Sequence, residues 1–265
     1  MIFRREMKRN LKSLLIWSCI LSGLVIMMLS LYPQMAADQQ AVKEMMDVYP
    51  EPLKKAFGMD KINFGSILGF FAIEVYMMTT LVGSIYAAML ASGILVKEEN
   101  DKTIEFLLSK PVNRSEIVLH KLGAVIANLL LFNIILTLTS LLGFQFADGA
   151  AYSGKVFALL AFATFILHLT IAAVSFLMSA IMRRTRNILS LSLGFVFISY
   201  FLNITAGVAE KFAFLKYVSF FKYVDAGDII VHESIRALFV WIMLIVTVLC
   251  ISTAFMYYKK KDIAV

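Results

Sequence analysis

Long apolar runs alternate with polar connections along the whole chain. About 20 residues of α-helix cross the hydrocarbon core of a membrane, and a lipid-exposed backbone must form its hydrogen bonds within its own helix. The pattern therefore predicts an all-α integral membrane protein with six transmembrane helices. These spans are expected at about residues 13–33, 67–96, 118–146, 156–182, 188–208 and 237–258.

The composition excludes an ordinary soluble protein. Hydrophobic residues make up 60% of the chain and charged residues 16%, and the mean hydropathy is +0.82, whereas soluble domains carry about 25% charged residues. Six spans leave no room for a sizeable soluble domain, so we expect residues 1–265 to form a single transmembrane domain. The net charge of +7 resides mainly at the ends of apolar runs, where it suits membrane lipid headgroups rather than nucleic acid.

The first twelve residues combine positive charge with a helical pattern of apolar positions. They contain five basic residues and one acidic residue, which predicts an amphipathic helix on the inner membrane surface over residues 1–12. The apolar run that follows is longer than the core of a secretory signal. We therefore expect it to remain as the first span.

The polar stretch 97–121 interrupts the apolar pattern most strongly. Ile104, Leu107 and Leu108 follow helical spacing and predict a short helix with one apolar face. Pro111 disfavours a helical conformation at the residue before it, and Asn113 and Glu116 have the spacing of a capping box that would start a new helix near residue 114. This arrangement indicates a docking element on the membrane surface.

The distribution of Lys and Arg predicts the orientation. The segments on the side of the termini, which include 97–121, hold 16 of these residues, and the segments on the other side hold 9. Positive residues favour the cytoplasmic side of a membrane. We therefore expect a multi-pass protein of the plasma membrane with both termini in the cytoplasm. On the outer side, residues 210–236 are too polar to span and predict short interfacial or re-entrant helices.

Two ionisable residues fall inside predicted spans. Glu74 is either an intramembrane functional group or a carboxylate at the interface, and the sequence does not separate these interpretations. His168 lies in the middle of the fourth span. We expect it to bind a neighbouring helix by a hydrogen bond rather than to relay protons.

Motifs for catalysis are missing from the sequence. It contains no G-x-x-x-x-G-K-[ST] loop for nucleotide phosphates and no H-E-x-x-H metal motif. We therefore expect a non-catalytic protein that binds no cofactor or metal itself. A secondary transporter, or a membrane enzyme or assembly factor without an ATPase partner, remains an alternative to a transport subunit driven by another chain.

The stretch EENDKTIEFLLSKPVNRSEI at 98–117 resembles the signature of class-2 ATP-binding cassette export permeases. The order of an acidic pair, Lys-Thr, an acidic residue, two leucines, Pro-Val, Arg and an acidic residue carries the resemblance. The stretch 219–228 is also similar to one found before the last span in that family.

The resemblance implies a permease that docks a separate ATP-binding cassette ATPase through a coupling helix within 97–117. It also implies a second permease copy, identical or paralogous, and ATP and Mg bound by the ATPase. In the contact with the ATPase we expect apolar packing by Ile104, Phe106, Leu107 and Leu108. Charge complementarity is expected from Glu98, Glu99, Glu105 and Arg114. The full predicted docking set is Glu98, Glu99, Thr103, Ile104, Glu105, Phe106, Leu107, Leu108, Pro111, Arg114 and Glu116.

Overall fold

The computed structural model describes residues 2–38, 40, 44, 47–56, 58–100, 112–147, 151–182, 185–208 and 210–261. These residues form helices and turns and contain no strand. Six helical segments are long and apolar enough to cross a membrane, which confirms the predicted all-α membrane fold. They are α1 (Ile2–Ala37), the composite segment Ile67–Ser92, α8 (Arg114–Phe144), α9 (Gly154–Ile181), α10 (Thr185–Val208) and α13 (Ala237–Lys260).

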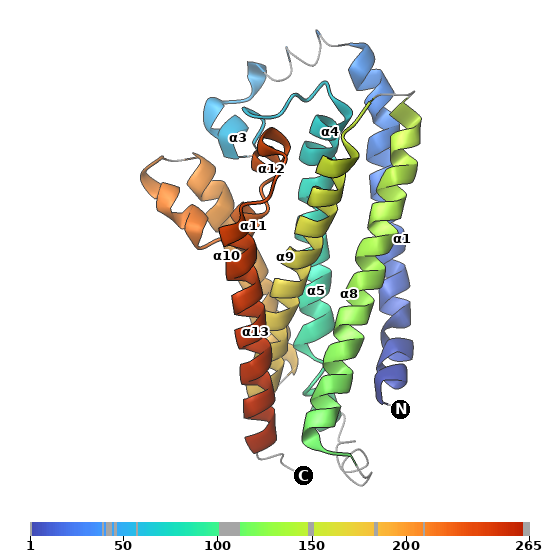
Figure 1. The fold of residues 1–265 in the computed structure, drawn as a ribbon, viewed down its shortest axis with the longest axis vertical. Coiled ribbons are helices and arrows are strands. Elements are labelled where there is room, and N and C mark those ends of the chain that lie inside the picture. The colour runs from blue at the N-terminus through green and yellow to red at the C-terminus, as the bar shows by residue number, and fades with distance from the viewer. Residues whose placement is uncertain are drawn as a thin grey trace.

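The six long segments run side by side in one bundle (Figure 1). α9 lies at the centre and contacts α5 (Met77–Ser92), α8 and α13, while α1 packs along α8 and α10 packs against α5. Both chain termini lie at the same end of the bundle, and the short helices α3 (Glu51–Ala56), α4 (Ile67–Phe70) and α12 (Ala226–His232) lie at the opposite end.

The first span differs from its prediction. The sequence predicted a separate amphipathic helix over residues 1–12 and a span that ends at Pro33. Instead, α1 is one continuous helix from Ile2 to Ala37 with Pro33 inside it. No glycine or proline separates residues 2–12 from the apolar run, so helical hydrogen bonds continue across the junction.

The second span is not a uniform α-helix. A π-helix, η1 (Phe71–Tyr76), separates α4 from α5. Ser66 caps the start of α4 by accepting a hydrogen bond from the amide of Gly69 at 3.1 Å. The helix ends at Ser92, four residues earlier than predicted, because residues 93–96 form a turn. Short π-helical segments occur frequently at functional sites.

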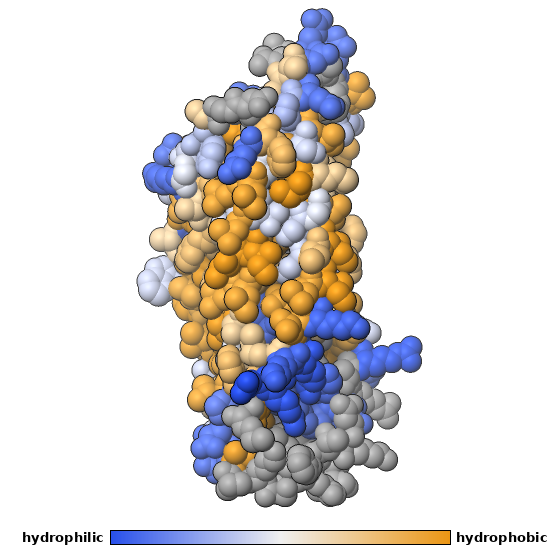
Figure 2. Space-filling view, turned by 90° about the vertical axis from the view of Figure 1, so that its right-hand side faces the viewer, coloured by the Kyte–Doolittle hydropathy of each residue, from blue (hydrophilic) through white to orange (hydrophobic). Residues whose placement is uncertain are grey.

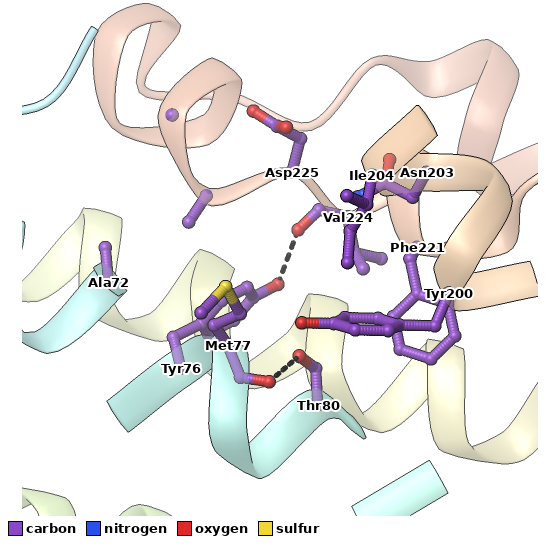
Figure 3. Close-up of a pocket in the computed structure, with 12 residues that line it drawn as sticks. Ala72, Tyr76, Met77, Thr80, Tyr200, Asn203, Ile204, Phe221, Val224 and Asp225 are labelled. Atoms are coloured by element: carbon purple, nitrogen blue, oxygen red, sulfur yellow. Dashed lines mark hydrogen bonds between the residues drawn. The ribbon is translucent and has the colours of Figure 1, made fainter. Parts of the chain in front are cut away.

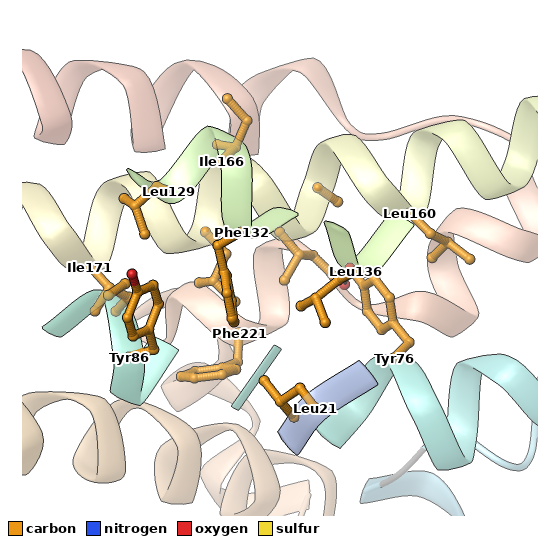
Figure 4. Packing of buried hydrophobic residues seen from close by; sticks show 14 of the residues in the cluster. Leu21, Tyr76, Tyr86, Leu129, Phe132, Leu136, Leu160, Ile166, Ile171 and Phe221 are labelled. Atoms are coloured by element: carbon orange, nitrogen blue, oxygen red, sulfur yellow. Dashed lines mark hydrogen bonds between the residues drawn. The ribbon is translucent and has the colours of Figure 1, made fainter. Parts of the chain in front are cut away.

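The core consists of large side chains from several helices (Figure 4). Leu21 of α1, Tyr86 of α5, Phe132 of α8 and Leu160 of α9 are at most 1% exposed. The ring centres of Tyr86 and Phe132 lie 4.5 Å apart. In a membrane, an apolar side chain gains no hydrophobic free energy by moving from lipid to a neighbouring helix. Close packing of side chains therefore holds the helices together.

Small residues allow α1 and α8 to approach closely. A Cβ atom added to Gly143 of α8 would lie 2.3 Å from Cδ1 of Leu29 in α1. Nearby on the same two helices, the hydroxyls of Ser22 in α1 and Thr139 in α8 lie 3.0 Å apart and share a hydrogen bond. The pair is therefore fixed by both packing and a polar contact.

The outer surface of the bundle matches a membrane. Figure 2 shows an apolar band across the middle of one face and hydrophilic residues toward both ends. Large apolar side chains also point outward from the spans, including Ile198, Phe201 and Trp241, each more than 60% exposed. An apolar surface of this extent suits lipid rather than water.

The segment before the last span folds into short helices. These are the 3-10 helix η3 (Glu210–Tyr217), α11 (Phe220–Tyr223) and α12. η3 and α11 contact α10, and α11 also contacts α13, whereas α12 contacts α9 and η1 (Figure 1). α3 also contacts α10, so short helices from two distant parts of the chain meet at this end.

Candidate docking site at the end of the bundle that carries the termini

Glu98 is the centre of a buried ionic cluster. The short helix α6 (Lys97–Asn100) carries it between α1 and α8, and the residue is 2% exposed. Lys121 of α8 is fully buried and forms an ion pair with the Glu98 carboxylate. Arg5 and Arg9 of α1 approach the same carboxylate at 3.0 and 3.6 Å. Three elements of the chain are thus joined at one acidic group.

The electrostatics of the cluster keep Glu98 ionised. Burial alone would raise the pKa of its carboxyl, but the Lys121 ammonium beside it, which also donates a hydrogen bond, and the Arg9 guanidinium lower that pKa below its ordinary value. Glu6 of α1 adds a second buried carboxylate that pairs with Arg9. Buried charges are stable only when they are paired in this way.

A second contact ties the other end of the chain to α6. The ammonium of Lys261 donates to the carboxylate of Glu99 at 3.0 Å and to the backbone carbonyl of Met182, after α9, at 3.3 Å. Arg114, the first residue of α8, donates to the backbone carbonyl of Lys261 at 2.7 Å. The C-terminal end of α13 therefore binds the residues on both sides of segment 101–111.

The start of α8 agrees with the sequence. Asn113 is its N-cap in a capping box, and the backbone amide of Asn113 donates to the Glu116 carboxylate at 3.3 Å. The prediction of a new helix near residue 114 is confirmed. The rest of the predicted docking helix, Thr103, Ile104, Glu105, Phe106, Leu107, Leu108 and Pro111, lies outside the described residues.

The predicted docking set did not include five members of this region, Arg5, Glu6, Arg9, Lys121 and Lys261. A signal existed for Lys121, because it falls inside the predicted third span, where an ionisable residue needs a partner. An acidic residue just before this span, such as Glu98, could have been proposed as that partner on this ground. The contact of Lys261 had no such signal, since it joins residues 162 positions apart.

His168 occupies the middle of the bundle. It is fully buried in α9, and its Nδ1 lies 3.1 Å from Oδ1 of Asn133 in α8. The expected hydrogen bond to a neighbouring helix is therefore present. On the other side, a Cβ atom added to Gly83 of α5 would lie 2.3 Å from Cε1 of His168. Gly83 thus provides the space that the imidazole fills.

Glu74 lies in the π-helix η1 near the end of the bundle opposite to the termini, and is partly exposed. Within the part of the chain that the structure describes, no ion pair involves this carboxylate. Its role stays a hypothesis.

A small pocket lies next to the π-helix (Figure 3). Its volume is about 60 Å³, and Tyr76, Met77 and Thr80 of the second span face Tyr200 of α10 and the loop before α12. The hydroxyl of Tyr76 donates to the backbone carbonyl of Val224 at 2.8 Å. This contact fixes the short-helix segment to the span that contains the π-helix.

The described residues contain no group of three His, Cys, Asp or Glu side chains able to hold a metal ion. The arrangement provides a mechanical connection between helices. Buried ion pairs join α1, α6, α8 and the end of α13 around a segment that connects two spans. A force applied to that segment would therefore reach several helices at once.

Comparisons with known proteins agree with this architecture. The family model described as ABC-2 family transporter protein matches residues 1–263. Over 215 residues the chain is 28% identical to the uncharacterized protein YhcI of Bacillus subtilis (strain 168), which corresponds to 70% of this chain and 66% of that protein. The chain thus covers just under two thirds of that relative.

Proposed function

Because the chain belongs to the ABC-2 transporter family and is a multi-pass membrane protein of the permease type, we propose that it is the transmembrane subunit of an ATP-driven exporter. In this proposal the chain forms the translocation path and docks a separate ATPase that binds ATP and Mg. A second permease copy, identical or paralogous, completes the assembly in the plasma membrane. The end with both termini faces the cytoplasm.

The observation that carries the proposal is the ionic cluster around Glu98. A subunit without its own nucleotide site must receive force from a partner, and the receiving segment has to be coupled rigidly to the spans. The pairs Glu98–Lys121 and Glu99–Lys261 connect residues directly before segment 101–111 to α8 and α13. Buried, paired charges resist separation strongly, since breaking one pair leaves the other charge uncompensated.

The predicted docking residues then fall into two roles. The apolar face of Ile104, Leu107 and Leu108, with Phe106, contacts the ATPase, and Glu105 adds charge complementarity. Glu98, whose carboxylate is satisfied inside the protein, positions α6 instead. ATP-driven closure of the ATPases would shift the bundle between two arrangements, and only a difference in binding free energy between those arrangements can drive this shift.

The test is the double substitution Leu107→Asp with Leu108→Asp in the full chain, expressed together with its ATPase. Two buried carboxylates at an apolar contact are expensive, so the ATPase should no longer co-purify and transport should stop. The control is Lys155→Asp, which changes the charge of an exposed side chain at the opposite end. Retention of the ATPase and of transport by the Leu107/Leu108 variant would show that docking occurs elsewhere.

A further inference from the structure

A polar cavity of about 300 Å³ opens at the end of the bundle opposite to the termini. Its walls come from α3 and the turn after it, the last turns of α10, η3, α11, α12 and the start of α13. The cavity therefore lies at the level where α10 ends, at Val208, and α13 begins, at Ala237. In a membrane this is the depth of the lipid headgroups.

The charges that line this cavity do not balance. Five of its side chains are cationic and three are carboxylates. Lys61 and Lys222 are matched by two of the carboxylates, because Lys61 pairs with Asp228 at 2.9 Å and Lys222 pairs with Asp225 and Asp228 at 3.0 and 3.1 Å. Burial would raise the pKa of the Asp228 carboxyl, but the hydrogen bond from Lys61 and the charge of Lys222 lower it. These two lysines and two aspartates carry equal and opposite charges.

Lys55 and Asp60 also line the cavity, and its other two cations are Lys216 and Arg236. Lys216 and Arg236 have no carboxylate partner among the described residues. The ammonium of Lys216 lies 5.1 Å from the ring centre of Tyr217, and the guanidinium of Arg236 lies 5.8 Å from that of Phe239. Contacts with ring faces leave the hydrogen-bond donors of both cations able to bind an anion.

Two exposed aromatic side chains lie on the η3 helix that borders the cavity. Tyr217 lines the cavity, and Phe214 precedes it by three residues in the 3-10 helix η3, so the two side chains lie on one face of that helix. Both are about 60% exposed. Aromatic side chains next to lysines are typical of the boundary between headgroups and acyl chains. The site thus offers cations for a headgroup and rings for the start of a chain.

From this geometry we infer that the cavity binds the phosphate of an anionic lipid, held by Lys216 and Arg236 with the lipid chains leaving past Phe214 and Tyr217. Phosphate matches the donors of both side chains, since the guanidinium can form two parallel hydrogen bonds and the ammonium acts as a point charge. The site is a property of the permease itself and requires neither the ATPase nor ATP. Failure of this inference would therefore leave the proposed function unaffected, and failure of the proposed function would leave this inference unaffected.

The test is a binding titration of the purified full-length chain in neutral detergent. The probes are short-chain phosphatidylglycerol, short-chain phosphatidylcholine and inorganic phosphate. The variants are Lys216→Gln with Arg236→Gln, the charge-preserving pair Lys216→Arg with Arg236→Lys, and Lys155→Gln as a control. Lys155 is an exposed lysine at the same end whose ion pair with Glu233 lies outside the cavity.

Phosphatidylglycerol should bind the unmodified protein at least about tenfold more tightly than the double glutamine variant, because two charge-assisted contacts are lost. The charge-preserving variant and Lys155→Gln should retain binding within about threefold of the unmodified protein. Phosphatidylcholine should not distinguish the variants.

Equal affinity of a folded double glutamine variant and the unmodified protein for phosphatidylglycerol would overturn the inference. A loss of the same size in Lys155→Gln would also overturn it, since the effect would then be general surface charge. Inorganic phosphate that binds as tightly as the lipid would reject the lipid as ligand. Gel filtration and thermal unfolding of each variant establish that it is folded before binding is compared.

Discussion

The hydroxyl of Tyr76, in the π-helix of the second span, donates to the backbone carbonyl of Val224 at 2.8 Å. This single bond joins a transmembrane segment to the short helices before the last span. Tyr76 is 4% exposed and Val224 is 2% exposed, so water does not replace the bond when it is broken. Segments 148 residues apart are thus connected through a side chain and a main-chain group.

Substitution Tyr76→Phe is expected to lower the free energy of unfolding by about 1–3 kcal/mol, because the Val224 carbonyl remains buried without a partner. Hydrogen exchange should rise in residues 224–232, which the bond holds in place. The control is Tyr200→Phe, which removes a hydroxyl from the same pocket without losing a hydrogen bond to any described residue. Unchanged exchange in Tyr76→Phe would mean that other contacts fix the segment.

Substitution Gly83→Ala should destabilise the bundle by about 2 kcal/mol, because the added methyl group meets the fully buried ring of His168. Thermal unfolding of the purified protein measures the effect. In a background of His168→Ala the same Gly83→Ala change should cost much less, since the obstacle is gone. Additive losses in this double-mutant cycle would show that the two residues do not interact.

Substitution Glu98→Gln should be among the most damaging single changes at the end of the bundle that carries the termini. It removes the carboxylate that forms the ion pair with the buried Lys121 ammonium, and loss of one member of a buried pair costs about 3–5 kcal/mol. Thermal unfolding measures the loss. Glu116→Gln is the matched control, because Glu116 only caps the exposed start of α8. A larger loss in the control than in Glu98→Gln would contradict the central role of Glu98.

The same carboxylate predicts a dependence on pH. The pKa of Glu98 is lower in the folded protein than its ordinary value of 4.5, so its ionic contacts stabilise the folded state fully above that value. The stabilisation is lost as the pH falls below the ordinary value and through the lowered folded one. Unfolding midpoints measured between neutral and acidic pH should therefore fall less steeply in Glu98→Gln than in the unmodified protein. Parallel curves would contradict this assignment.

The sequence could predict the number, type and approximate position of the spans because lipid imposes a simple rule. Each crossing needs a long apolar helix, whatever its neighbours are. The capping box at Asn113 and Glu116 was predictable for a similar reason, since its hydrogen bonds join residues three positions apart. The hydrogen bond from His168 to a neighbouring helix was also predictable, because a polar group buried in an apolar helix needs a hydrogen-bond partner.

What the sequence determined by itself is thus local: hydrophobic length, helix starts and the overall charge asymmetry. Only the tertiary structure decided that η1 interrupts the second span, and that Glu98 meets Lys121 while Glu99 meets Lys261. These features depend on which helices lie side by side. A buried charge selects its partner by distance in space, and no periodicity along the chain records that distance.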